Sequence, residues 1–372
     1  IQMPSIWYQV GLHSDEFDVV GFSFAGMPGV IIGHNARIAW GLTNVGPDVQ
    51  DLYVEKLNPQ DPDQYEFQGE WVDMDLRYET IEVAGRDEPV VIKVRSTRHG
   101  PIINDVLHGP TSDWAYGWQP LALRWTALEP GSMATSILAL DRAQNWYQFR
   151  EALSMWDVPS QNMIYADVDG NIGYQMPGRI PIRAQGDGTM PAPGWSGEYE
   201  WEGWIPFEEL PNTLNPPEGY IVTANNPVVD TSYPYFISRD WALGYRAQRI
   251  VDLLTEQETF SLTDMARIQM DSYDMSAAEV LPYLLELEPE EPELVEALER
   301  LGDWDLQMRR ESTPAALYGA FWVLLMDDLL ADDLGERPGG YGEKLVVREL
   351  VQQPDSLWWD DVGTPGEVET RD

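Results

Sequence analysis

The chain has 372 residues, of which 43% are hydrophobic and 16 are tryptophan, so it can fold around a sizeable core. Acidic residues outnumber basic ones by 63 to 23 and give a net charge of −40, which argues against a nucleic-acid partner because phosphate binding needs a basic face. The chain has no cysteine, which excludes disulfides, thiolate catalysis and cysteine-bound zinc.

The acidic excess has two interpretations. It can be a patch that binds cations, or it can be a solvated coat spread over the surface, as in proteins adapted to high salt. Salt screens the mutual repulsion of such carboxylates, and we favour the coat. This halophile-like surface predicts weak folding at low ionic strength.

Up to about Arg124 the pattern predicts strands, because short apolar runs such as 29–32 and 38–40 are punctuated by glycine, asparagine and proline. The pattern predicts that residues 80–83 and 90–94 form two paired strands. Residues 136–156 have the apolar spacing of a helix.

A tight hairpin is predicted next, where residues 163–168 and 172–174 flank Asp169-Gly170. Residues 178–235 are rich in proline, glycine and tryptophan and predict long structured loops.

From Trp241 onward the pattern becomes helical, with helix starts predicted at Thr263, Ser276, Glu291 and Thr313-Pro314. The longest apolar run, 315–326, is too short for a membrane span and predicts a buried helix. The strands-then-helices order divides the chain into a β-rich part, 1–240, and a mainly helical part, 241–372. The two ends carry no start or stop signal, so we expect a piece of a longer protein.

The histidines and one serine motif offer weak catalytic signals. His34 and His99 have no second histidine at metal-ligand spacing, so each is interpreted as structural. Ser23 has glycine two residues before it but Ala25 two residues after it, where a hydrolase elbow needs a second glycine.

Two polar segments carry stronger candidates. Asp48, the carbonyl of Gln50, and Asp51 have oxygen donors at a spacing that suits calcium, although a polar turn explains them equally simply. Asn225 follows the strand-like run 220–223, where an amide N–H can stabilise a developing oxyanion. On spacing alone the favoured interpretation is a turn in both places.

Together, several blocks give the chain a family resemblance, and they occur in order along most of its length. It resembles the β subunit of penicillin acylases, which are N-terminal-nucleophile amidohydrolases and include acyl-homoserine-lactone and cephalosporin acylases. The blocks are Gly33-His34-Asn35, 38–41 with Thr43, Asp48 and Asp51, Arg98-His99-Gly100, 165–174, Pro193-Gly194, 204–207 and Asn225-Asn226. The resemblance implies an α+β fold, the four-layer αββα sandwich, with an added helical region.

The resemblance also implies a mechanism. A precursor of this family cleaves itself and frees a serine as the first residue of the β subunit, and the α-amino group of that serine acts as its base. Both this serine and the α subunit, the expected partner, would precede Ile1, so we expect this chain alone to be inactive.

The resemblance assigns roles to three residues of an expected catalytic shell. Asn44 would supply a backbone N–H to the oxyanion hole, and Asn225 would supply its side-chain amide. Arg246 would brace Asn225. Ile32 and Leu42 fall at positions that line the acyl pocket, and aliphatic residues there favour an acyl chain over a phenylacetyl ring.

A structural calcium ion is the expected cofactor, with no organic cofactor. The resemblance assigns its ligands to Asp48, Gln50 and Asp51, with a further carbonyl from Gly188. Asp230 and Asp240 both stay open as further ligands.

The function expected from these residues is hydrolysis of an amide between an apolar acyl group and a polar amine, outside the cytoplasm in the periplasm or beyond. Three alternatives stay open: an acyl-homoserine-lactone acylase, a non-catalytic calcium-binding relative, and a glycan-processing enzyme. The last is suggested by the many tryptophans and by Glu208-Glu209.

Overall fold

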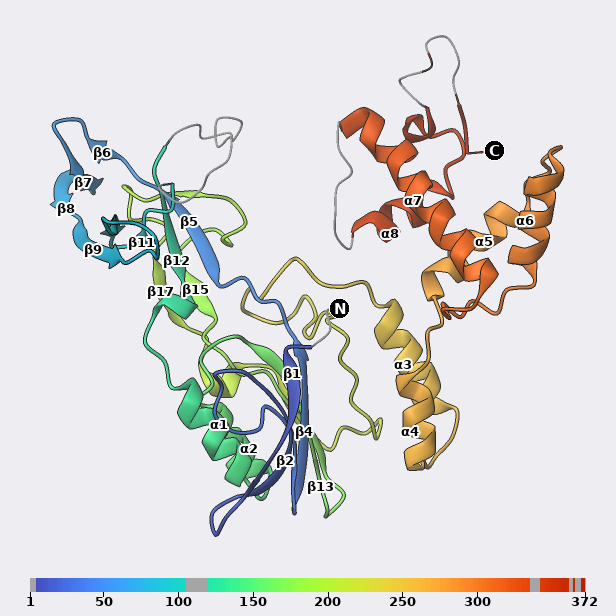
Figure 1. Cartoon of the computed structure of the whole chain (residues 1–372), viewed down its shortest axis with the longest axis horizontal. Helices are drawn as coiled ribbons and strands as arrows, with labels where there is room; N and C mark the ends of the chain where they lie inside the picture. The colour runs from blue at the N-terminus through green and yellow to red at the C-terminus, as the bar shows by residue number, and fades with distance from the viewer. Residues whose placement is uncertain (1–4, 105–118, 335–341, 361–363, 365–368, 372) are drawn as a thin grey trace. The chain divides into compact units, whose positions relative to one another are not determined.

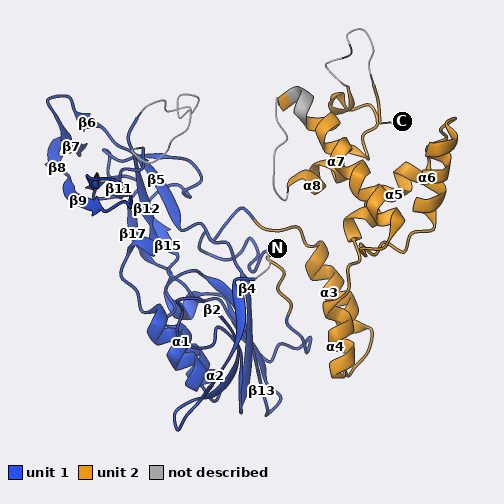
Figure 2. Cartoon of the chain, viewed as in Figure 1, with its two compact units in different colours: residues 1–221, 227–240 blue, residues 222–226, 241–372 orange. Residues whose placement is uncertain are grey.

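The computed structural model describes residues 5–104, 119–334, 342–360, 364 and 369–371. They form two compact units (Figure 2), the first made of residues 1–221 and 227–240 and the second of 222–226 and 241–372. Strands dominate the first unit and helices the second, as an α+β chain requires.

A seven-stranded antiparallel sheet is the largest element of the first unit. Side chains alternate across it, so that Ile38 and Trp40 are buried while Ala39 between them is exposed. In spatial order its strands are β1 (Trp7–His13), β2 (Asp18–Phe24), β3 (Ile32–Asn35), β4 (Ile38–Asn44), β13 (Gln161–Asp167), β14 (Ile172–Gln175) and β18 (Asn212–Leu214).

The predicted hairpin at Asp169-Gly170 is confirmed, because β13 pairs with β14 around it. Gly170 has φ +90°, a value that side-chain-bearing residues rarely adopt. The carboxylate of Asp167 fixes the turn by accepting the N–H groups of Asp169 and Asn171 at 2.9 Å each. The turn sequence therefore sets the register of both strands.

Two helices, α1 (Met133–Arg142) and α2 (Trp146–Leu153), lie against one face of this sheet (Figure 1). The prediction of one helix across 136–156 is wrong, because the chain breaks at residues 143–145. There the side chain of Asn145 caps α2 by accepting the N–H of Gln148. Both helices still bury their apolar faces, including Leu140 and Phe149, against the sheet.

Short strands make the rest of the first unit. Its small core contains Tyr53, Tyr65, Met74, Ile102 and Ala122. The predicted pairing of 80–83 with 90–94 is confirmed in part, since Ile81 pairs with Val90 and the first strand extends back to Asp75.

These short strands form four small sheets. The strands are β5 (Gln50–Val54), β6 (Leu57–Asn58), β7 (Asp61–Phe67), β8 (Glu70–Asp73), β9 (Asp75–Ile81), β10 (Val90–Thr97), β11 (Gly100–Pro101), β12 (Leu121–Trp125), β15 (Pro181–Arg183), β16 (Ala192–Pro193) and β17 (Trp201–Trp204). Two 3₁₀ turns, η2 (Thr126–Leu128) and η3 (Phe207–Glu209), complete the described elements of the unit.

The second unit is helical, and the four predicted helix starts each fall within one residue of an observed one. Ser261 and Asp264 form a capping box at the helix that begins at Leu262, and Asp274 caps the helix that begins at Met275. The helices are α3 (Tyr245–Thr255), α4 (Leu262–Gln269), α5 (Met275–Leu285), α6 (Pro292–Gly302), α7 (Thr313–Leu334) and α8 (Gly342–Leu350), with the short η4 (Leu357–Trp359). Among the described residues, none of the helices is both long and apolar enough to cross a bilayer.

Candidate functional site

Asn44 lies at the end of β4, where amide side chains of β13 hold it. Gln161 is its pairing partner in β13 and donates its Nε2 to the Asn44 Oδ1 at 2.9 Å. The buried Asn162 donates its Nδ2 to the Asn44 carbonyl at 3.2 Å and accepts the hydroxyl of Tyr174 at 2.7 Å. Main chain and side chain of Asn44 are thus anchored separately.

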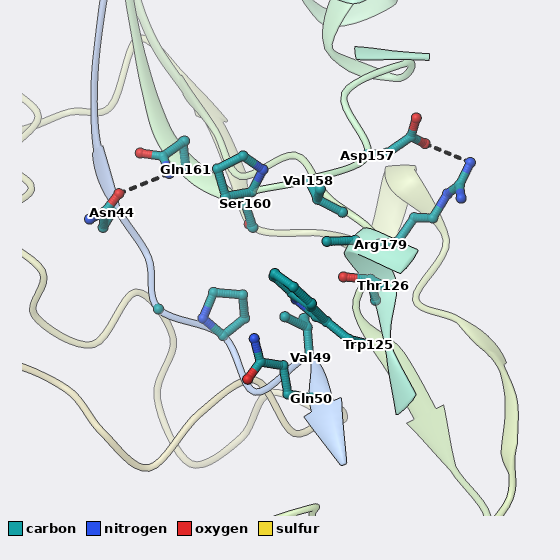
Figure 3. Close-up of a pocket in the computed structure, with 14 residues that line it drawn as sticks. Asn44, Val49, Gln50, Trp125, Thr126, Asp157, Val158, Ser160, Gln161 and Arg179 are labelled. Atoms are coloured by element: carbon teal, nitrogen blue, oxygen red, sulfur yellow. Dashed lines mark hydrogen bonds and ion pairs between the residues drawn. The ribbon is translucent and has the colours of Figure 1, made fainter. Parts of the chain in front are cut away.

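A pocket of about 540 Å³ opens beside Asn44 (Figure 3), a size typical of small-ligand sites. Its lining mixes apolar side chains, including an aromatic ring, with amides, a hydroxyl and an ion pair between Arg179 and Asp157 at 2.8 Å. The apolar lining comes from Pro47, Val49, Trp125, Val158 and Pro159, and the polar lining includes Asn44, Gln50, Ser160 and Gln161.

The assignment of Ile32 and Leu42 to an acyl pocket stays a prediction. Ile32 and Leu42 are partly buried and pack against the core between the large sheet and its helices. Neither is among the described residues that line the pocket beside Asn44. Trp125 does line this pocket. The sequence around Trp125 gave no sign of a binding role, since a tryptophan that ends a strand is usually a core residue.

Asn225 and Arg246 meet within the second unit. Arg246 donates its Nη2 to the Asn225 Oδ1 and to the Ala224 carbonyl, both at 2.8 Å. The backbone at Asn225 has φ +64°, and its carbonyl accepts the Ala242 N–H at 2.9 Å. Because its oxygen faces the guanidinium, the carboxamide has one orientation, in which Nδ2 is the donating end.

The predicted calcium ligands lie around a buried guanidinium. Arg183 donates to both carboxylate oxygens of Asp51, from Nη2 at 2.6 Å and from Nε at 2.8 Å. The same Nη2 is 3.1 Å from the Asp48 carbonyl and 3.5 Å from its carboxylate. Burial raises the pKa of Asp48, while the charge of Arg183 acts in the opposite direction.

In this arrangement these residues do not fit a calcium ion, because Arg183 already occupies the space between the two carboxylates. The second Asp51 oxygen also accepts the Trp201 indole N–H at 2.7 Å. Within the described residues no three histidine, cysteine or acidic side chains gather in a way that could hold a metal. Calcium stays a prediction from the sequence.

The other predicted or possible calcium ligands include Asp230, Asp240 and Gln50. Asp230 and Asp240 are exposed, and Gln50 lies opposite Trp125 in the β5–β12 pair.

His99 is the most enclosed of the histidines that the structure describes, and its partners are structural. Its side chain is 1% exposed and its two ring nitrogens face Glu55 at 2.8 Å and Glu200 at 2.7 Å. The ring stacks on Tyr53 with centroids 3.9 Å apart. His34 is exposed, and Ser23 is buried within β2, so neither has the setting of a catalytic group.

Comparison with known proteins places these features in a family. The penicillin amidase family model matches residues 1–372. The chain is 31% identical to the acyl-homoserine lactone acylase QuiP of Pseudomonas aeruginosa, over 98% of the chain and 46% of the relative. It is 33% identical to the penicillin acylase 2 proenzyme of Pseudomonas sp. strain SE83, over 86% of the chain and 40% of that protein.

A solved structure gives the same result for the fold. The thermostable penicillin G acylase of Alcaligenes faecalis superposes with a TM-score of 0.75 at 28% identity, covering 99% of this chain and 69% of that one. The predicted N-terminal-nucleophile hydrolase fold is therefore confirmed. The chain spans about half the length of the curated relatives that it matches. The chain belongs to the penicillin amidase family.

Proposed function

We propose that the protein hydrolyses an amide bond between an apolar acyl group and a polar amine. A serine freed by self-cleavage, in a segment that precedes Ile1 in the precursor, attacks the amide carbonyl, and its own α-amino group takes the proton. The acyl group then passes from the serine to water. An α-amine suits this step because it titrates near neutral pH.

The observation that carries the proposal is the bracing of Asn225 by Arg246. An oxyanion hole needs an amide donor with a fixed direction, and removal of one such donor typically costs about 3 kcal/mol of transition-state stabilisation. Arg246 supplies that fixed direction by holding the Oδ1 at 2.8 Å. We assign the backbone N–H of Asn44 to the same role, with the main chain of Asn44 held by Asn162.

The pocket beside Asn44 supports an apolar acyl group. Its wall of Val49, Trp125 and Pro159 can remove an alkyl chain or a ring from water, at about 25 cal/mol for each Å² buried. The amides of Asn44 and Gln161 would face the polar end of the substrate. Assembly with an α subunit from the same precursor, and a location in the periplasm or outside the cell, belong to this proposal.

Acyl-homoserine lactones are the second candidate substrates. Relatives with this name cover nearly all of the chain, whereas the penicillin G acylase of Escherichia coli, at 34% identity, covers 71% of it. The two substrate classes share the scissile amide and differ in the acyl chain and the amine. A panel of long-chain acyl-homoserine lactones and phenylacetyl amides, offered to the full-length protein, separates them by kcat/KM.

Replacement of Asn225 by glycine tests the chemistry, since glycine keeps the left-handed backbone and removes only the carboxamide. We expect kcat of the full-length protein to fall about 10²–10³-fold with an unchanged circular dichroism spectrum. Asn215→Gly is the matched control, because Asn215 is also an asparagine with positive φ, at +52°. Equal activity in both variants would contradict the role of Asn225.

The nucleophile has its own test. Mass spectrometry of the mature protein should find a new chain that begins with serine, a short way before Ile1. A covalent acyl adduct should form on that residue. A mature protein without serine, threonine or cysteine at a new amino terminus would overturn the amidase proposal and leave a non-catalytic relative.

A further inference from the structure

We infer that the positive charge at the Asp48–Asp51 site is the guanidinium of Arg183, so that this site is complete without a bound metal ion. The inference concerns the architecture of the first unit and does not depend on the proposed amidase activity.

The first argument is the coordination around Arg183. Its Nη2 has three oxygens around it: the Asp51 Oδ1 at 2.6 Å, the Asp48 carbonyl at 3.1 Å and the Asp48 Oδ1 at 3.5 Å. Its Nε completes a two-point contact with Asp51 at 2.8 Å. A planar guanidinium can donate two parallel hydrogen bonds to one carboxylate. The contact therefore neutralises the carboxylate charge and also fixes the orientation of both groups. The carboxylates of Asp48 and Asp51 are two of the ligands that the family resemblance assigns to calcium.

The second argument is enclosure. The side chains of Arg183 and Asp51 are 4% and 6% exposed, so the pair is a buried one. Burial of two charges is tolerated only when they are paired and hydrogen-bonded, and here Trp201 satisfies the remaining side of Asp51. Without Arg183, two acidic groups would face one another in a desolvated site.

The third argument is space. Gly188 has φ +83°, and a Cβ placed there would clash with the Asp51 Oδ1 and lie 2.7 Å from the Arg183 Nη2. The backbone at Gly188 thus lies against the ion pair, with no room for a side chain between them. A calcium ion needs six to eight oxygens at about 2.3–2.6 Å. Around Asp51 it would compete with a guanidinium of like charge for the same oxygens.

The strand pairing explains how the chain brings these groups together. Arg183 ends β15 and pairs with Trp201 of β17, while Asp51 lies in β5. The contact therefore ties three strands with one side chain. The neighbouring Asp187 has its own partner, because Arg239 contacts it at 2.5 Å.

The first experiment uses the full-length wild-type protein at constant ionic strength. Its Tm is measured in calcium chloride, in magnesium chloride and in EDTA, and terbium luminescence is excited through tryptophan. We expect equal Tm values in all three solutions and no saturable terbium signal. A stoichiometric terbium site, displaced by calcium and accompanied by a lower Tm in EDTA, would overturn the inference.

The second experiment removes the guanidinium. A cavity of about 330 Å³, lined by Asp51, Arg183 and Gly188, gives added ions a route to the site. In Arg183→Ala we expect Tm to fall by roughly 5–10 °C, part of the loss to return with millimolar calcium, and a terbium signal to appear. No loss of Tm in this variant would count against the inference.

A matched control and a conservative variant complete the test. Arg37→Ala removes an exposed arginine that contacts Asp169 at 2.5 Å, and its Tm should change little and not respond to calcium. Arg183→Lys keeps the charge with a single point of contact, so its Tm should be intermediate and insensitive to calcium. If Arg183→Ala does not fold, the wild-type and lysine measurements decide alone.

Discussion

The two halves of the first unit are stabilised by different physics. The large sheet and α1 and α2 enclose an almost wholly apolar core, which includes Leu140, Phe149 and Met163 with no measurable exposure. The small sheets have a core of five buried apolar residues and beside it two buried ionic clusters. One cluster centres on His99 and the other on Arg183.

This difference predicts that the stabilities of the two halves respond differently to pH and ionic strength. Apolar burial responds weakly to pH and ionic strength, whereas buried ionic clusters respond to proton binding. We therefore expect the sheet-and-helix layer to keep its stability over a wide pH range, apart from the contribution of its buried carboxylate, Asp141. The small sheets should be the part that pH perturbs first.

The largest expected effect comes from Leu140→Ala, which breaks the apolar half. Leu140 is fully buried between α1 and the sheet, so the variant should lose about 3–5 kcal/mol of unfolding free energy through lost burial and a cavity. Urea denaturation of the full-length protein at pH 6 and at pH 8 measures it. The loss should be equal at both pH values. A loss confined to one of them would contradict the comparison.

The next effect comes from His99→Gln, which breaks one ionic cluster. Burial lowers the pKa of His99, but hydrogen bonds to Glu200 and Glu55 raise it above its usual 6.5 overall. The folded state therefore holds the proton more tightly than the unfolded state. This contribution is fully present below pH 6.5 and is lost as pH rises through the higher folded-state pKa.

We expect His99→Gln to cost about 2–3 kcal/mol at pH 6 and less at higher pH. Urea midpoints between pH 6 and pH 9 measure the change. The exposed His34→Gln serves as the control and should follow the wild-type profile. A constant cost of His99→Gln across this range would argue for a neutral, purely packed imidazole.

The smallest effect sharpens the comparison, because it tests the one buried carboxylate in the apolar half. Burial raises the pKa of Asp141 to about 6, against a hydrogen bond from the Val30 N–H and the charge of Arg142. Here the folded state favours the neutral acid. The contribution of Asp141 to the unfolding free energy is largest below pH 3.8 and is lost as pH rises through about 6.

Asp141→Asn should remove this dependence, since an asparagine oxygen can still accept the Val30 N–H. We expect the variant to be more stable than the wild type at pH 7, by about 1–2 kcal/mol. Thermal unfolding between pH 4.5 and pH 7 measures the two slopes. Parallel slopes would show that Asp141 does not titrate in this window.

The sequence predicted well those features that depend on neighbouring residues. Asp169-Gly170 determines its hairpin, and the helix starts predicted at Thr263 and Thr313 lie within one residue of the observed ones, because turns and caps are satisfied by groups a few residues away. The same locality explains the error at residues 143–145. Apolar spacing runs through the break, and a helical pattern does not reveal where a cap interrupts it.

The contacts that depend on tertiary structure could not be predicted in this way. Asp51 and Arg183 are 132 residues apart, and nothing near either one names the other. His99 and Glu200 are likewise far apart in sequence, at 101 residues. The place of Trp125 in the pocket also depends on segments distant in the chain. Family resemblance reached Asn225 and Arg246 because they occur in recognisable blocks. It also assigned Asp51 to a calcium ion, and our inference that Arg183 takes the place of that ion needed the tertiary contacts.

The separate anchoring of Asn44 has a practical consequence for engineering. The side-chain amide of Gln161 contacts the Asn44 side chain, while the side-chain amide of Asn162 holds the Asn44 carbonyl. Positions 44 and 161 can therefore be randomised as a pair to reshape the cavity wall, while the main chain keeps its support. Libraries built on this pair should change the shape of the pocket with little loss of folded protein.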